Sequence, residues 1–239
     1  MEPRRVKNRI AGVGVELEGG WIYGKAVSKV VHDGSVKFSK IIYDQPNPPH
    51  AVGEIPSPKL TTEQVDDWIK KNYPQHVNET CGLHVHMSFK YPLNYMRLMT
   101  PDYTVVLVKS LAEWCEEHKL PADHPQWKRL KNPRHDHCAH IYLGDSQVRL
   151  TKKNYNSRGG PESRYTFVNY CYSMGDTPRK TVECRGLSMF ETADMSCDAV
   201  HAVLNTTNAF LAKVREKEPR LRARVALGPV AKLRYRTTI

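Results

Sequence analysis

The stretch CGLHVHMSF (residues 81–89) places two histidines two positions apart in an otherwise apolar segment. Successive side chains of a β-strand point to opposite faces, so His84 and His86 are expected on the same face. We therefore predict a strand that directs two imidazoles toward one place beside the sheet.

Two further segments show the same spacing of polar residues. Glu16 and Glu18 are two apart in GVGVELE, and Glu183 and Arg185 are two apart in TVECRGL. A buried carboxylate without a partner is costly, so such side chains require a cation, a metal ion or water nearby. If the strands belong to one sheet, the polar side chains converge on one surface. The predicted set is Glu16, Glu18, Glu54, His84, His86, Glu183 and Arg185.

Several carboxylates with one or two imidazoles form a mostly oxygen ligand set, which suits Mg²⁺ or Mn²⁺ bound together with phosphate. Arg185, two residues from a glutamate, suits a phosphate because the guanidinium fork matches phosphate oxygens. Each pair taken alone has a simpler interpretation: a chance His-x-His, glutamates on a solvated face, or a surface ion pair of little energetic value. The three pairs together favour a metal and phosphate site.

Strands and helices do not alternate regularly along the chain, which argues against a doubly wound parallel sheet. We predict an α+β fold, with an antiparallel sheet and helices on one side. A hairpin is expected over residues 21–38, because the turn signal His32-Asp33-Gly34-Ser35 separates two β-rich segments. Other strands are expected over 10–18, 51–58, 81–89, 163–174 and 180–190, helices over 61–73, 101–118 and 194–217, and loops over 119–163.

Length and composition fit one domain over residues 1–217, with a loop-rich insertion at about 119–163, and a basic tail over 218–239. The net charge of +11 favours anionic partners such as nucleotides, carboxylates or nucleic acid. The six cysteines form no CxxC pair, so we expect reduced thiols in a cytosol-like compartment. No apolar run approaches the roughly 18 residues of a membrane span. We expect a cytoplasmic protein without membrane association.

The motifs resemble those of the amidoligases, small members of the carboxylate–amine ligase superfamily that includes glutamate–cysteine ligase and, more remotely, glutamine synthetase. The combination of GLHVH with ECR after an early ELE is specific, whereas each piece alone is weak. The matching pieces follow the family order from residue 12 to about 210. They are GVGVELE (12–18), HDGSV (32–36), VGEIPSP (52–58), CGLHVHMSF (81–89), SRYTFVN (163–169) and TVECRGLSMFETAD (181–194).

The resemblance implies a curved, mainly antiparallel sheet that forms a half-open funnel, with helices on its outer face and ATP and Mg²⁺ inside. ATP would phosphorylate a substrate carboxylate, and an amine would then attack the acyl phosphate to form an amide. Arg185 would contact the transferring phosphoryl group, and Arg164 would hold a substrate carboxylate or a phosphate. The resemblance implies Glu16, Glu18, Glu54, His84 and Glu183 as metal ligands, and His86, Asn169, Asp33 and Ser35 as substrate or second-sphere contacts.

Two polar segments have alternative interpretations. The run RHDHCAH (residues 134–140), preceded by Cys115 and His118, has residue types that bind zinc, in loose spacing. A surface loop, or a loop that covers the active site and contacts the substrate, is also compatible with it. Residues 152–164 suit a lid hinged at Gly159-Gly160, or a plain connection. The arginine-rich tail suits a nucleic-acid-binding arm or a solvated end.

Three functions are therefore weighed. The first is an ATP-dependent carboxylate–amine ligase whose acceptor is an amino acid, a peptide, a cell-wall fragment or a modified nucleobase. The second is a metal-dependent nuclease or phosphatase that uses the same carboxylates and histidines without ATP. The third is a non-catalytic module that binds nucleic acid through the basic tail.

Overall fold

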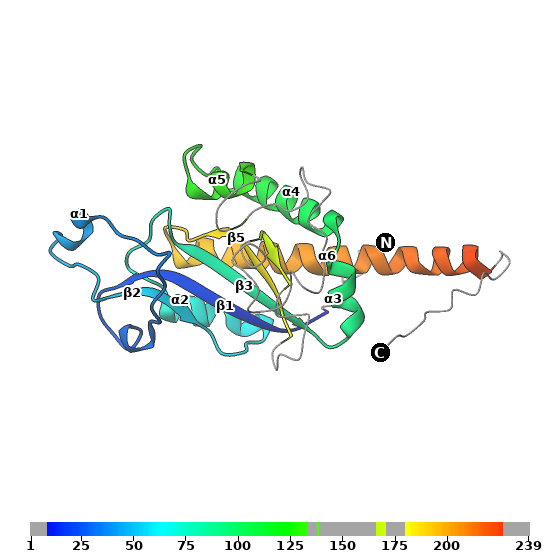
Figure 1. The fold of residues 1–239 in the computed structure, drawn as a ribbon, viewed down its shortest axis with the longest axis horizontal. Helices are drawn as coiled ribbons and strands as arrows, with labels where there is room; N and C mark the ends of the chain where they lie inside the picture. Colours follow the sequence, from blue (N-terminus) through cyan, green and yellow to red (C-terminus); the bar gives the residue numbers. More distant parts are fainter. Residues whose placement is uncertain (1–8, 133–137, 139–165, 171–179, 227–239) are drawn as a thin grey trace, which may run out of the picture.

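The computed structural model of the 239-residue chain describes residues 9–132, 138, 166–170 and 180–226. Five strands form one open antiparallel sheet in the order β2-β1-β3-β5-β4 (Figure 1). The predicted α+β class and antiparallel sheet are confirmed. The strands are β1 (Ile10–Trp21), β2 (Ala51–Pro56), β3 (Gly82–Phe89), β4 (Val168–Asn169) and β5 (Val182–Ser188).

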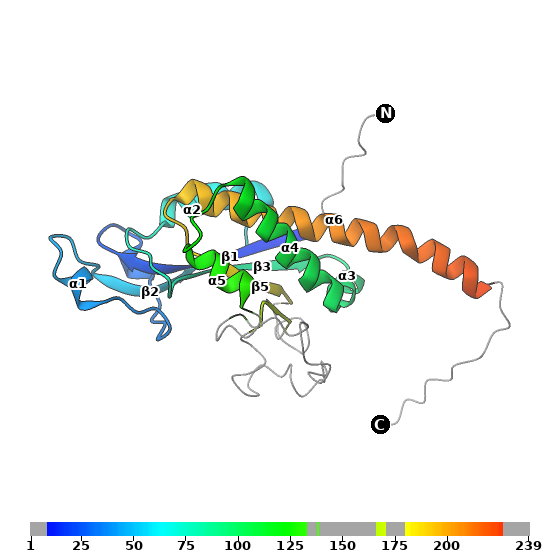
Figure 2. The ribbon, with the colours of Figure 1, turned by 90° about the horizontal axis from the view of Figure 1, so that it is seen from above.

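Helices cover one side of this sheet. The long helix α6 contacts β3, and α2 and α4 pack against α6 (Figure 2). Beyond the sheet, α6 continues as a projecting rod. The helices are α1 (Lys40–Tyr43), α2 (Val65–Asn72), α3 (Pro92–Leu98), α4 (Pro101–Glu117), α5 (Pro125–Lys131) and α6 (Ala193–Ala226), with 3-10 turns at Val27–Lys29 and Thr62–Gln64.

The core lies between the helices and one face of the sheet. Alternate residues of β1 and β3 are buried there, and the Thr207 hydroxyl of α6 lies 3.3 Å from the sulfur of Met87. Burial of each such Val, Leu or Met side chain stabilises the fold by about 1.5–3 kcal/mol. Because side chains alternate, the intervening residues of the same strands face away from these helices. The core residues of β1 and β3 are Val13, Val15, Leu17, Leu83, Val85 and Met87.

The hairpin predicted over residues 21–38 is wrong. β1 extends to Trp21, and residues 22–50, all of them described, contain turns, one 3-10 turn and the short α1 but no strand. Trp21 is fully buried, and its indole N–H donates to the backbone oxygen of Asn72 at 2.9 Å. β1 therefore ends at Trp21, and the segment with the turn signal at His32–Ser35 docks on β2, where Val31 and Glu54 exchange two backbone hydrogen bonds.

Helix predictions hold with shifted limits. The expected helix over 61–73 is a 3-10 turn followed by α2, and Gln64 Oε1 accepts the Thr61 backbone N–H at 2.9 Å, as the capping-box spacing predicts. α5 lies inside the segment interpreted as loops, and α3 was not predicted. α6 runs past residue 217, where the helix was expected to end, to Ala226.

Candidate metal and phosphate site

The sheet register brings the predicted polar residues of different strands side by side. Glu16 of β1 lies opposite His84 of β3, and His86 lies opposite Glu183 of β5. On the other side of β1, Glu18 lies opposite Glu54 of β2. These residues occupy the alternate positions that point away from the core helices. The structure thus places six of the seven pattern-predicted residues opposite or beside one another on three adjoining strand pairs, and the seventh, Arg185, lies on β5 next to Glu183.

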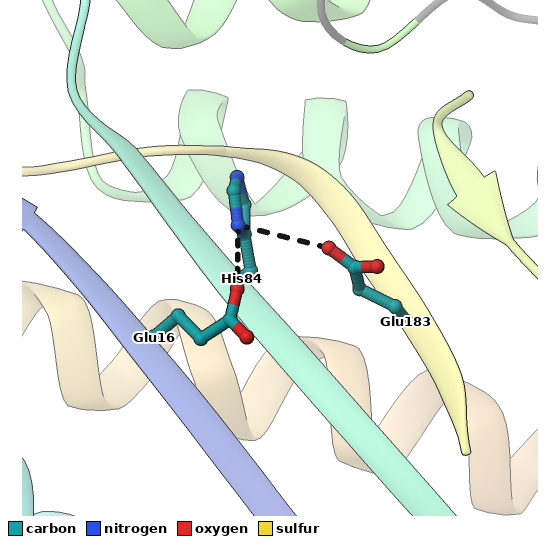
Figure 3. Close-up of side chains that lie close together, drawn as sticks. All are labelled: Glu16, His84 and Glu183. Carbon is teal, nitrogen blue, oxygen red and sulfur yellow. Dashed lines mark hydrogen bonds and ion pairs between the residues drawn. The ribbon is translucent and has the colours of Figure 1, made fainter. Parts of the chain in front are cut away.

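The first group consists of Glu16, His84 and Glu183 (Figure 3). His84 Nδ1 lies 3.1 Å from Glu16 Oε2 and 3.6 Å from Glu183 Oε1. One ligand atom from each residue lies within 4.8 Å of the others, which is close enough for one ion to reach all three. His84 and Glu183 are buried, and Glu16 remains partly accessible, so the group opens to solvent on the Glu16 side.

Glu183 is the most enclosed carboxylate of this group, and both of its oxygens have partners. Arg185 Nη1 donates to Oε1 at 2.6 Å, and Asn169 Nδ2 donates to Oε2 at 2.8 Å. Burial alone raises the pKa of Glu183, but the charge of Arg185, followed by those of His86 and His84, holds it below its usual range. The carboxylate is therefore ionised and oriented.

His86 completes the contacts of Glu16. Its Nε2 lies 3.0 Å from Glu16 Oε1, and its Nδ1 lies 3.4 Å from the Thr181 hydroxyl. Burial opposes the charged imidazole, but the nearby charge of Glu183 and the Glu16 contact raise the pKa of His86. Burial likewise opposes ionisation of Glu16, and hydrogen bonds with His84 and His86 lower the pKa of that carboxyl. His86 thus supports Glu16 from the side away from His84.

The second group consists of Glu18, Asp33 and Glu54, whose carboxylate oxygens lie within 4.8 Å of one another. Glu18 is buried, and its Oε2 accepts the Gly82 backbone N–H at 2.5 Å. Burial, followed by repulsion from Glu16 and Asp33, raises the pKa of Glu54 to about 7. Three carboxylates this close are mutually destabilising without a cation.

Asp33 reaches this group because its segment docks on β2. Val31 and Glu54 exchange two backbone hydrogen bonds of 2.8 and 2.9 Å. Gly53 permits the approach: its φ is +153°, and a Cβ there would lie 2.1 Å from the Val31 carbonyl oxygen. The Ser35 N–H donates to Asp33 Oδ1 at 2.7 Å, so burial, which raises the pKa of Asp33, is outweighed and the pKa is lowered.

His84 joins the two groups. Its Nδ1 faces Glu16 and Glu183 of the first group, while its Nε2 lies 3.6 Å from Glu18 Oε1 of the second. The donors are mostly carboxylate oxygens, which are the ligands that Mg²⁺ and Mn²⁺ prefer. The repelling carboxylates of the second group give an independent reason for a cation. The residues present therefore fit two divalent ions, one at each group.

Other predicted site residues fall elsewhere. Arg164 lies outside the described residues, as do the His/Cys run 134–140 except Cys138 and the lid segment 152–164. His118 stacks on Trp114 and its Nδ1 lies 2.9 Å from the Trp114 carbonyl oxygen. Among the described residues, the metal-compatible groups are the two above, and neither contains Cys115 or His118. The described part of the chain lends no support to zinc there.

Sequence reasoning did not identify two contributors to the site. The Gly82 N–H holds Glu18, and the Thr181 hydroxyl contacts His86. A backbone donor leaves no signal in side-chain patterning. Thr181, however, lies two residues before Glu183 and so shares its strand face, which the same alternation would have indicated.

Comparisons of the chain with models of protein families, with curated proteins and with solved structures found no match. Within the described residues, no helix combines the length and the apolar character required to cross a bilayer.

Proposed function

We propose that the chain is an ATP-dependent ligase that joins a carboxylate to an amine through an acyl phosphate. The observation that carries the proposal is the Glu183–Arg185 pair beside two carboxylate groups bridged by His84. Phosphoryl transfer requires positioning and neutralisation of charge rather than a protein nucleophile. On one sheet face, the site offers acidic side chains that could hold metal ions and an arginine that could contact a phosphate.

The chain's own residues have distinct parts in this proposal. Glu16, His84 and Glu183 would hold one Mg²⁺ or Mn²⁺, and Glu18, Asp33 and Glu54 would hold a second. Divalent ions, if bound there, would neutralise charge on the phosphate oxygens. Arg185, kept in place by Glu183 at 2.6 Å, would direct its guanidinium at the transferring phosphoryl group. Asn169 would keep Glu183 oriented.

The reaction would proceed in two steps. A substrate carboxylate oxygen attacks the γ-phosphorus of ATP, the bond to ADP breaks, and an acyl phosphate forms. The amine nitrogen then attacks the acyl carbon, phosphate leaves, and the nitrogen loses a proton. No thiolate is required. Burial raises the pKa of the thiols of Cys81 and Cys184, the cysteines nearest these residues in sequence, to about 12, which argues against thiol catalysis there.

The first experiment is thermal unfolding with Mg²⁺ and ATP together, Mg²⁺ alone, and Mg²⁺ with GTP. A ligand at about 100 times its dissociation constant adds roughly 2.7 kcal/mol, which is about 5–10 °C for a chain of this size. A shift that requires both Mg²⁺ and ATP supports the ligase and leads to a screen of carboxylates and amines for amine-dependent ADP release. Absence of any nucleotide effect would contradict the proposal.

The second candidate is a metal-dependent nuclease or phosphatase. The two adjacent acidic groups and the net charge of +11 favour it, since paired metal ions also support phosphodiester hydrolysis. It predicts Mg²⁺-dependent cleavage of nucleic acid or of phosphate esters without ATP. Amine-dependent release of ADP distinguishes the ligase from this hydrolase.

A further inference from the structure

Helix α5 places two buried polar side chains against the strand that carries Glu183 and Arg185. Gln126 is fully buried, its Nε2 donates to the Gly186 carbonyl oxygen at 2.8 Å, and its Oε1 accepts the Ser188 N–H at 2.8 Å. Because both polar ends of this amide are hydrogen-bonded, its burial costs little free energy. Its two bonds to one strand fix the backbone of that strand.

The contacted backbone is the irregular part of β5. Leu83 pairs with Leu187 and Val85 pairs with Cys184, so β5 has one more residue than β3 between these pairs. This β-bulge breaks the β3–β5 ladder locally, while the Arg185 N–H donates to the Phe167 carbonyl oxygen at 2.9 Å. Gln126 bonds the backbone within and beside the bulge and so holds it in one arrangement.

Arg129 links the bulge to the peptide that holds Glu18 of the second group. It is 3% exposed, its Nη1 donates to the Arg185 carbonyl oxygen at 3.3 Å, and its Nη2 donates to the Cys81 carbonyl oxygen at 3.3 Å. The Cys81 carbonyl and the Gly82 N–H belong to the same peptide unit, and that N–H donates to Glu18 at 2.5 Å. One guanidinium thus orients both the backbone of Arg185 and the peptide that holds Glu18.

The bulge also decides which side chains of β5 share a face. A slip of one residue turns strand side chains to the opposite face. Arg185 and Glu183 share the site face, where they form their 2.6 Å contact, while Cys184 and Leu187, three positions apart, are both buried in the core. Only a bulge between Cys184 and Leu187 satisfies both conditions.

We infer that Gln126 and Arg129 are positioning residues, which act on the candidate site by holding the β5 bulge and the Cys81–Gly82 peptide. Gln126 sets the direction of Arg185 relative to Glu183, and Arg129 couples this pair to Glu18. The expected effect on the rate of ADP formation rests on the proposed function, whereas the expected effect on the backbone of the β5 bulge and of Gly82 does not.

The test compares Gln126→Met and Arg129→Met with the conservative Arg129→Lys. Lys128→Met is the matched control, because Lys128 lies on the same helix but is exposed. Leu111→Ala, a buried residue of α4, controls for loss of stability alone. Two measurements are made on the full chain: hydrogen exchange of the amides of Gly82 and residues 184–188, and the kcat and KM for ADP formation.

Both Met variants are expected to exchange the amides of residues 184–188 at least about tenfold faster than wild type, and Arg129→Met also that of Gly82, while Lys128→Met does not. A misplacement near 1 Å can cost about 100-fold in rate, so kcat is expected to fall about 10- to 100-fold with a change in the KM for ATP below about threefold. Arg129→Lys, which keeps the charge and one donor, is expected to recover part of kcat.

The inference is overturned if exchange at these amides is unchanged, or if kcat falls no more than in Leu111→Ala at a matched loss of thermal stability. If Arg129→Met does not fold, Arg129→Lys and Gln126→Met decide the matter. If wild type gives no ADP with any substrate, the proposed function fails, and the exchange data still decide whether α5 holds the bulge.

Discussion

His84 and Glu16 face each other across β3 and β1, with 3.1 Å between the imidazole Nδ1 and the carboxylate Oε2. The same imidazole approaches Glu18 through its other nitrogen at 3.6 Å. One buried side chain therefore stands between two acidic groups that come from four different segments. This relationship makes the two groups one site and leads to the following predictions.

Glu183→Gln is expected to abolish the joint effect of Mg²⁺ and ATP on thermal stability and to lower ADP formation by at least about 100-fold, because the neutral amide neither binds the ion nor holds the Arg185 guanidinium. Thermal shift and ADP release measure the two effects. Glu113→Gln, which makes the same change on an exposed residue of α4, is expected to behave as wild type. Turnover in Glu183→Gln at the wild-type rate would show that Glu183 is not part of the active site.

Glu54→Gln is expected to stabilise the protein in the absence of metal ions, because it removes one of three repelling carboxylates of the second group. The gain at pH 8 is about 1 kcal/mol, a value kept small because Glu54 is only partly buried. Urea unfolding in EDTA measures the change, and Mg²⁺ should then stabilise the variant less than wild type. A loss of stability in EDTA would contradict the assigned repulsion.

Mg²⁺ affinity is expected to rise with pH between 6 and 8. The pKa of Glu54 is about 7, so its carboxyl is mostly protonated at pH 6 and mostly ionised at pH 8, and a proton competes with the ion. Ionisation of this one group accounts for about a tenfold gain in affinity. Titration calorimetry at pH 6, 7 and 8 measures the slope of Mg²⁺ affinity against pH.

The matched measurement uses Glu54→Gln, in which most of this slope should disappear. A smaller slope of the same sign is expected to remain, because the pKa of His86 is raised and its imidazolium, paired with Glu16, also loses its charge as the pH rises. An undiminished slope in the variant would assign the titration to a group other than Glu54.

Gly53→Ala is expected to lower stability by about 1–3 kcal/mol and to weaken Mg²⁺ binding, since the added Cβ collides with the Val31 carbonyl oxygen and displaces Asp33. Gly24→Ala provides the control, because Gly24 also has a positive φ (+92°) but no atom within 4 Å of the added Cβ. It should lose about 1 kcal/mol with unchanged Mg²⁺ binding. Equal Mg²⁺ binding in both variants would show that Asp33 does not contribute to the metal site.

Much of the candidate site was predictable because strand alternation is a local property. The spacing of Glu16 with Glu18, and of His84 with His86, is sufficient to assign each pair to one face. The capping signal at Thr61 likewise predicted a helix start. The hairpin failed because its turn residues serve another purpose: Asp33 and Ser35 form a local hydrogen bond on a segment that docks against β2.

The sequence by itself determined which side chains share a strand face, since that depends only on the two-residue period of an extended chain. Only the tertiary structure decided that Glu18 meets Glu54, that Asp33 joins them over Gly53, and that the β5 bulge holds Arg185 beside Glu183. Register, docking and bulges depend on contacts between residues distant in the chain, and such contacts leave no periodic signal in any one segment.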